Sequence, residues 1–199
     1  PCFVLDLTAT PKKESNIISY VDAVQLKNEH MVKLPVIVYN RDSQSEVLID
    51  AIDLRNKLEE IADAEYTKTG KYIRPIALFQ AQPKGKEDAT TFEKLRDKLV
   101  DAGIPAEQIA IRTADVNELK NTDLMSPTCP IRYIITVNAL KEGWDCPYAY
   151  ILASLANKTS QVDVEQILGR ILRLPHTSQH TQSALNMSYV LTSSNDFNN

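Results

Sequence analysis

The chain has 199 residues, of which 43% are hydrophobic and 24% are charged, with a formal net charge of −4 at pH 7. This size suits one domain, or one domain with an appendage, and the composition is that of an ordinary globular protein. The negative charge argues against a protein that wraps nucleic acid with its whole surface, and no apolar run is long enough to span a bilayer, so we expect local DNA contact at most and no membrane.

Short apolar runs predict strands, and apolar residues three or four positions apart predict helices. In chain order we predict strand Phe3–Leu7, helix Ile17–Asn28, strand Val36–Tyr39, helix Glu46–Lys68, strand Ile76–Ala81, helix Thr90–Gly103, strands Ile109–Ile111, Ile131–Val137 and Tyr150–Leu155, helix Val162–Leu174, and strand Met187–Leu191. Such alternation predicts an α/β fold with a mostly parallel sheet and helices on both faces.

The last predicted helix contains Gln166–Arg173, which divides its residues between two faces. At about 100° per residue, Gln166, Gly169, Arg170 and Arg173 lie on one face and aliphatic residues on the other. Two permanently charged guanidinium groups on a rigid element suit the oxygens of a polyphosphate. A glycine costs a helix about 1 kcal/mol, so its place beside the arginines indicates that a large group comes close. The alternative is an amphipathic helix with solvated arginines.

A second polar motif joins two predicted strands. Ile131–Val137 leads into a short helical turn that ends at Gly143, and Asp145 precedes the strand Tyr150–Leu155. A carboxylate at a strand end can accept a hydrogen bond from a ligand hydroxyl. The alternative is that Gly143 closes the turn and Asp145 only caps it.

Both motifs resemble those of a known family. Glu142–Pro147 resembles motif V, and Gln166–Arg173 resembles motif VI, of superfamily 2 helicases and translocases. The residues of both motifs are most similar to those of the helicase (Res) subunit of type III restriction enzymes. Pro75–Gln80 stands where motif IV is expected. The resemblance implies a RecA-like, P-loop NTPase-type α/β domain.

Near the start of the chain, Leu5–Pro11 is similar to motif III, which couples the nucleotide site to the nucleic-acid site. The coupling residues would be Thr8, Ala9 and Thr10. No Gly-x-x-x-x-Gly-Lys-Ser/Thr loop occurs in the chain, and no Asp-Glu-x-His-type segment precedes motif III. We therefore expect residues 1–40 to be the tail of the first RecA-like domain with a linker, and residues 41–199 to be the second RecA-like domain.

On this assignment, the strands Phe3–Leu7 and Val36–Tyr39 would belong to the sheet of the first domain and would lack their neighbours. Unpaired strand edges and uncovered apolar residues are costly in water. We expect these strands to pair with a second copy or to stay mobile, with non-native packing on the second domain as the alternative.

The resemblance implies an ATP-driven motor. The first domain would hold most of the ATP and Mg²⁺, while Arg170 and Arg173 would reach the phosphates from the second domain. An arginine finger is worth about 10³–10⁵ in rate. Gln166 would orient the arginines or the attacking water, and Asp145 would accept a hydrogen bond from the ribose, close to Gly143. The chain alone should be inactive as an ATPase.

A translocase ignores sequence, so we expect DNA contact through the backbone. Lys84, Gly85 and Lys86 offer two ammonium groups and backbone N–H groups after the motif IV strand, although a solvated loop is an equal alternative. Thr136 and Asn138 lie on either side of the position where RNA-binding relatives carry a threonine. We take both as candidate nucleic-acid contacts.

The resemblance implies double-stranded DNA, the first RecA-like domain of the same parent chain and a modification methyltransferase subunit as partners. One alternative is another superfamily 2 DNA-repair or RNA helicase. Another is a non-catalytic α/β interaction module whose arginine face binds protein. Convergence of Arg170, Arg173 and Asp145 in one cleft, which we expect at the carboxyl edge of the sheet, would argue against the interaction module.

The cysteines and histidines carry little further signal. Cys2, Cys129 and Cys146 are odd in number and lack metal-type spacing, which indicates reduced thiols and a cytoplasmic protein. His176 and His180 lie four residues apart in a polar stretch, and we expect loop residues there without a metal.

Overall fold

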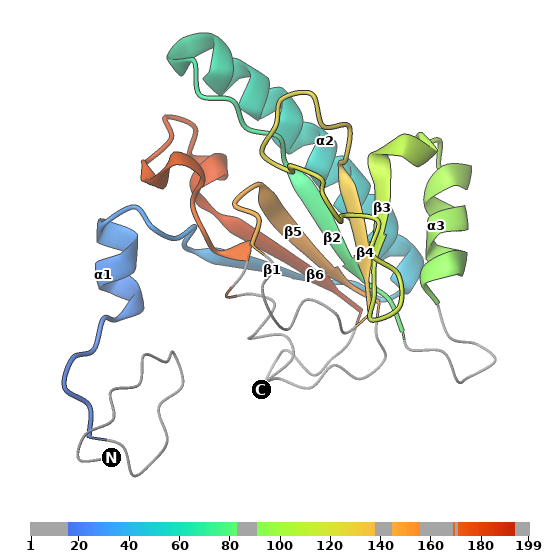
Figure 1. The fold of residues 1–199 in the computed structure, drawn as a ribbon, viewed down its shortest axis with the longest axis horizontal. Helices are drawn as coiled ribbons and strands as arrows, with labels where there is room; N and C mark the ends of the chain where they lie inside the picture. The colour runs from blue at the N-terminus through green and yellow to red at the C-terminus, as the bar shows by residue number, and fades with distance from the viewer. Residues whose placement is uncertain (1–15, 83–90, 138–144, 156–168, 170, 194–199) are drawn as a thin grey trace.

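The computed structural model describes residues 16–82, 91–137, 145–155, 169 and 171–193 (Figure 1). Within them lies one six-stranded sheet with the strand order β1-β6-β5-β2-β4-β3, and every neighbouring pair is parallel. The strands are β1 (Val36–Asn40), β2 (Ile76–Gln80), β3 (Ile109–Arg112), β4 (Tyr133–Thr136), β5 (Ala149–Ser154) and β6 (Ser188–Thr192). This confirms the predicted α/β class with a parallel sheet, as in RecA-like folds.

Three α-helices have both ends among the described residues, and local signals mark these ends. They are α1 (Ala23–Asn28), α2 (Gln44–Thr69) and α3 (Phe92–Asp101), with short 3₁₀ turns η1 (Ala106–Gln108), η2 (Pro175–Thr177) and η3 (Ser183–Asn186). The Ser43 hydroxyl caps α2 at its start, and Gly70, at φ +72°, ends it in a left-handed conformation that suits glycine. No helix of the described residues is long and apolar enough to cross a membrane.

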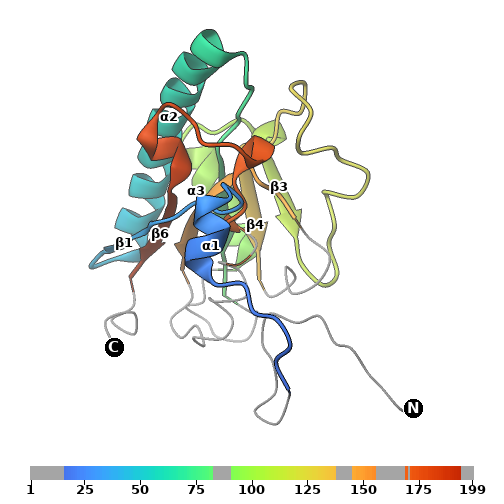
Figure 2. The same cartoon turned by 90° about the vertical axis from the view of Figure 1, so that its left-hand side faces the viewer.

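The predicted helix over Ile17–Asn28 is wrong in its first half. The observed α1 starts only at Ala23, because Asp22 and Gln25 form a capping box in which each side chain accepts a hydrogen bond from the other residue's backbone N–H. None of the six residues of α1 is buried. Figure 1 shows α1 standing apart from the sheet, at the end where β1 begins, and Figure 2 views the molecule from that side.

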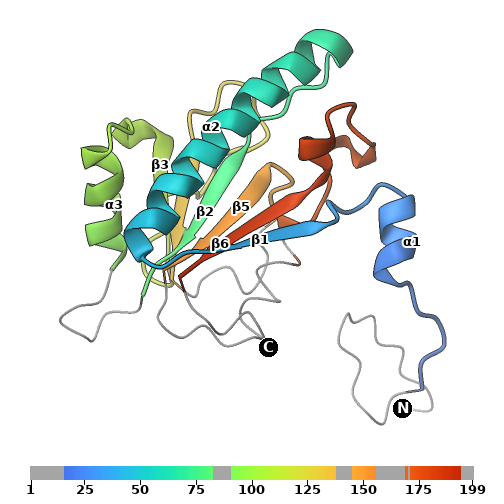
Figure 3. The ribbon, with the colours of Figure 1, turned by 180° about the vertical axis from the view of Figure 1, so that it is seen from behind.

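The core lies around the two central strands. Every residue of β2 and β5 is buried. Side chains alternate between the two faces of a strand, so both faces of the sheet's centre are covered. Helix α2 runs along one of them (Figure 3), and Val47, Ala51 and Leu58 are among its buried residues.

The first strand contradicts our expectation for residues 36–39. β1 pairs with β6 in parallel along its whole length, from Val36 opposite Ser188 to Asn40 opposite Thr192. It is therefore an edge strand of the same sheet, neither unpaired nor waiting for a second copy. One edge of β6 provides hydrogen-bond partners for the backbone of β1. The two strands are about 150 residues apart, so local sequence does not reveal this pairing. Phe3–Leu7 lies outside the described residues.

Candidate functional site

An exposed ion pair joins the two sequence motifs. Arg173 Nη1 donates a hydrogen bond to Asp145 Oδ2 over 2.5 Å, although the residues are 28 positions apart. Their side chains are 62% and 43% exposed, respectively. A carboxylate and a guanidinium group that the sequence singled out separately therefore form one surface site.

Backbone pairing with the segment before β1 holds Arg173. Arg173 forms an antiparallel bridge with Val32. On either side, the backbone N–H of Lys33 donates to Leu172 O over 2.5 Å, and that of Leu174 donates to Met31 O over 3.0 Å. The predicted helix over Val162–Leu174 is therefore too long, since Arg173 lies in extended backbone.

Two causes account for this early helix end. Leu174 precedes Pro175, and the residue before a proline is pushed out of the helical region; Leu174 has φ −79° and ψ 127°. Residues 31–33 also offer backbone partners to residues 172–174. Gly169 and Ile171 are helical. Apart from its chain neighbours and the backbone of its own helix, no described atom lies within 4 Å of where a Cβ of Gly169 would stand, so packing against the described residues does not require a glycine there.

Asp145 immediately precedes a tight turn that leads into β5. The backbone N–H of Ala149 donates to Cys146 O over 3.0 Å, which closes the turn. The Tyr148 hydroxyl donates to Tyr72 O over 2.7 Å and ties the turn to the segment before β2. Cys146 is fully buried, and burial raises the pKa of its thiol to about 11, so the group is neutral at physiological pH.

Lys33 lies beneath this turn, and our sequence reasoning missed it. Its Nζ donates to Pro147 O and to Ala149 O, both over 2.7 Å, and lies 4.1 Å from the centre of the Tyr150 ring. Lys33 is fully buried, and burial lowers the pKa of its ammonium to about 7, partly offset by the Asp145 carboxylate. The available sequence signal was a single lysine among the apolar residues before β1.

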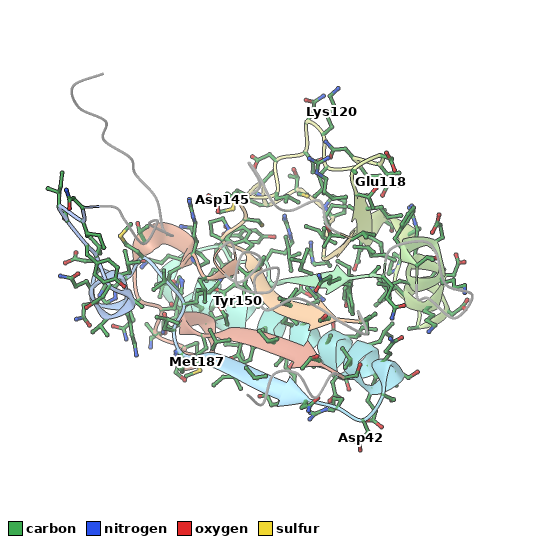
Figure 4. All side chains as sticks on the ribbon, turned by 90° about the horizontal axis from the view of Figure 1, so that it is seen from below. Asp42, Glu118, Lys120, Asp145, Tyr150 and Met187 are labelled. Carbon is green, nitrogen blue, oxygen red and sulfur yellow. The ribbon has the colours of Figure 1, made fainter. Side chains whose placement is uncertain are left out.

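The ion pair lies at the amino edge of the sheet, so the expected position at the carboxyl edge is wrong. Asp145 precedes β5, and Val32, which bridges to Arg173, precedes β1. Because β4 and β5 are parallel, the connection between them returns the chain to the amino edge before β5 starts. In Figure 4, Asp145 lies far from Asp42, which follows the carboxyl end of β1.

The carboxyl edge carries a different set of polar residues. The final residues of all six strands are polar and lie in register across the sheet, in the order Asn40, Thr192, Ser154, Gln80, Thr136 and Arg112. Thr136 is buried, and its hydroxyl has no hydrogen-bond partner among the described residues. The candidate nucleic-acid residue Thr136 and the Asp145–Arg173 pair therefore lie at opposite edges of the sheet.

Most of the other predicted site residues lie outside the described part of the chain. They are Thr8, Ala9, Thr10, Lys84, Gly85, Lys86, Asn138, Gly143, Gln166 and Arg170. Among the described residues, no group of three or more His, Cys, Asp or Glu side chains could hold a metal ion.

The two histidines noted in the sequence lie close together, His176 within η2 and His180 three residues after it. His176 is exposed and has its Nε2 2.9 Å from Tyr72 O. His180 is buried beside the buried Glu65, with its Nδ1 3.7 Å from Glu65 Oε1. Burial lowers the pKa of His180 to about 4, so the ring is neutral near pH 7.

Comparison with known proteins adds no family assignment. The chain matches no family model, and a search of curated proteins finds no significant match.

Proposed function

We propose that the chain is the second motor domain of an ATP-dependent DNA translocase or helicase, of the kind found in type III restriction enzymes. The observation that carries this proposal is the ion pair between Asp145 and Arg173. These residues belong to the segments that resemble motifs V and VI, and they meet on an exposed edge of a parallel α/β sheet. A shared nucleotide site requires these two segments to lie close together.

The chemistry of the pair suits a nucleotide. A guanidinium group has five N–H donors, and the bond to Asp145 comes from Nη1, so donors remain for phosphate oxygens. An exposed ion pair is worth about 0.2–1 kcal/mol. Arg173 therefore exchanges its carboxylate partner for a phosphate at little cost, and Asp145 is then free to accept a hydrogen bond from a ribose hydroxyl.

In this proposal, ATP supplies the phosphoryl group whose transfer to water drives the motor. Arg173, with Arg170, places positive charge where negative charge develops in the transition state. The phosphate loop and the Mg²⁺ ligands come from the first RecA-like domain, because the chain contains no such loop. Loss of the phosphate that the arginines contact then lets the two domains separate.

One exposed apolar surface supports a partner for this domain. Residues before and within α1 expose apolar side chains: Ile17, Ile18, Tyr20, Val21 and Val24. Grouped apolar residues of this kind are typical of an interface. The same arm reaches the ion pair through the bond from Leu174 N to Met31 O. We propose the first RecA-like domain as its partner.

At the opposite edge, the ends of β2 and β4 are neighbours, with Gln80 opposite Thr136. The candidate residues Lys84, Lys86 and Asn138 follow these two strand ends in the sequence. We propose this edge for contact with the DNA backbone. We also propose that a methyltransferase subunit is a further partner and that the protein acts in the cytoplasm.

A nuclear magnetic resonance titration with Mg-ATP tests the nucleotide site on the chain itself. At millimolar nucleotide, we expect the largest amide shifts at Asp145, Cys146 and residues 172–174. Arg173→Gln should abolish these shifts. The control Asp42→Asn removes an exposed aspartate at the other edge (Figure 4) and should leave them intact. Shifts centred elsewhere, or an unchanged response of the Arg173 variant, would overturn the proposal.

A further inference from the structure

Lys33 contacts both halves of the candidate site from the inside of the protein. Its side chain binds the turn after Asp145, through Pro147 O and Ala149 O. Its backbone N–H binds Leu172 O, next to Arg173. Its backbone oxygen accepts a hydrogen bond from the Ser188 hydroxyl, the first residue of β6. Lys33 therefore ties two separate segments to one point of the sheet.

The two carbonyl bonds restrict how the turn enters β5. Pro147 and Ala149 are two residues apart, so an ammonium group bound to both oxygens sets the direction in which the chain enters the strand. The carboxylate of Asp145, two residues earlier, is exposed and contacts Arg173 across the surface. The bonds from Lys33 therefore restrain the backbone next to Asp145, while the ion pair restrains its side chain.

A buried lysine is a costly way to fill space. A methionine of similar length would avoid the desolvation of an ammonium group. Here the cost is offset by two hydrogen bonds of 2.7 Å and by the Tyr150 ring 4.1 Å away. These contacts converge on the turn that carries Asp145.

We propose that Lys33 is a positioning residue, which holds the Asp145 turn and the Arg173 segment at the separation that the nucleotide site uses. The consequence for nucleotide binding rests on the proposed function. The positioning itself does not, because it concerns the protein without ligand.

Protonation of Lys33 offers a test without mutation. Its pKa is lowered to about 7 by burial, so the ammonium loses a donor near neutral pH. The groups that face it are the Asp145 carboxylate, the neutral Cys146 thiol and the Tyr150 ring, whose hydroxyl pKa is raised by burial. Arg173 stands beyond Asp145. As the pH is changed, the amide resonances of the Asp145 turn and of Leu172 should therefore shift with the same midpoint as the Lys33 side-chain resonance.

The mutational test compares Lys33→Met with Lys27→Met, which changes an exposed lysine of α1. Without nucleotide, Lys33→Met should shift the amides of residues 145–149 and 172–174 and abolish the pH response near 7. Its affinity for Mg-ATP should fall about tenfold, equivalent to about 1.4 kcal/mol. The Lys27 variant should match the wild type in all three measurements.

The outcomes separate the two proposals. A folded Lys33→Met variant with both segments unshifted would overturn the positioning role. Shifted segments with unchanged Mg-ATP affinity would support the positioning role and overturn the nucleotide site. If the variant does not fold, the wild-type titration decides, and different midpoints for Lys33 and the Asp145 turn would overturn the positioning role.

Discussion

Replacing Arg173 with alanine should leave the fold intact and lower the rate of ATP hydrolysis in the two-domain enzyme that we propose. The Arg173 side chain is 62% exposed, and its carboxylate partner is 43% exposed. An exposed ion pair contributes about 0.2–1 kcal/mol, and the bridge to Val32 uses backbone atoms that alanine keeps. We therefore expect the free energy of unfolding to fall by less than about 1 kcal/mol, measured by urea denaturation of the chain.

The effect on turnover should be far larger. In the two-domain enzyme that we propose, removal of an arginine finger lowers kcat by about 10³ or more, equivalent to roughly 4 kcal/mol of transition-state stabilisation. Affinity for DNA should stay nearly unchanged, because the proposed DNA surface lies at the opposite edge of the sheet. Steady-state ATP turnover and fluorescence anisotropy with labelled DNA measure the two quantities separately.

Arg96→Ala is the matched control. Arg96 forms a comparable surface ion pair with Glu118 over 3.0 Å, at 35% and 36% exposure. Its loss should cost similar stability and no turnover. An unfolding free energy lowered by more than about 2 kcal/mol in Arg173→Ala would show a structural pair instead. Weaker DNA binding with intact turnover would move Arg173 to the nucleic-acid surface.

Three further predictions concern the chain alone. The purified 199-residue chain should not hydrolyse ATP, since it lacks a phosphate loop; DNA-stimulated phosphate release above that of a mock purification would refute this. The lowered pKa of Lys33, about 7 against 10.5, means that the unfolded chain binds more protons above pH 7, so stability should rise from pH 7 to 9. Above pH 9 the raised pKa of Cys146 acts in the opposite direction, and Lys33→Met should flatten the rise in urea midpoints; an unaltered slope would contradict the assignment. The pKa of His180 is lowered from 6.5 to about 4, so stability should be lost as the pH falls through that window, by about 3 kcal/mol in total. His180→Phe should remove this part of the acid limb, and an identical acid limb in both proteins would show that His180 is not its source.

The sequence by itself determined the elements whose signals are local. The predicted helix Glu46–Lys68 corresponds to the observed Gln44–Thr69, because its apolar periodicity, the Ser43 cap and the Gly70 stop all lie within or beside it. The strand at Ile76–Ala81 was predicted within one residue, since a fully buried strand appears as a short apolar run. The alternation of such elements is enough to predict a parallel α/β sheet.

Only the tertiary structure decided what depends on distant pairing. The edge position of β1 comes from Ser188 opposite Val36, and the extended backbone at Arg173 comes from Val32. The return of the chain before β5 placed Asp145 at the amino edge of the sheet. The expectation that Asp145 and the arginines meet at the carboxyl edge was therefore wrong. The role that we propose for Lys33 depends on carbonyl oxygens more than 110 residues away. Backbone donors and acceptors are the same at nearly every residue, whatever the side chain. The sequence therefore does not show which segment will form the hydrogen bonds of a given strand edge or buried carbonyl.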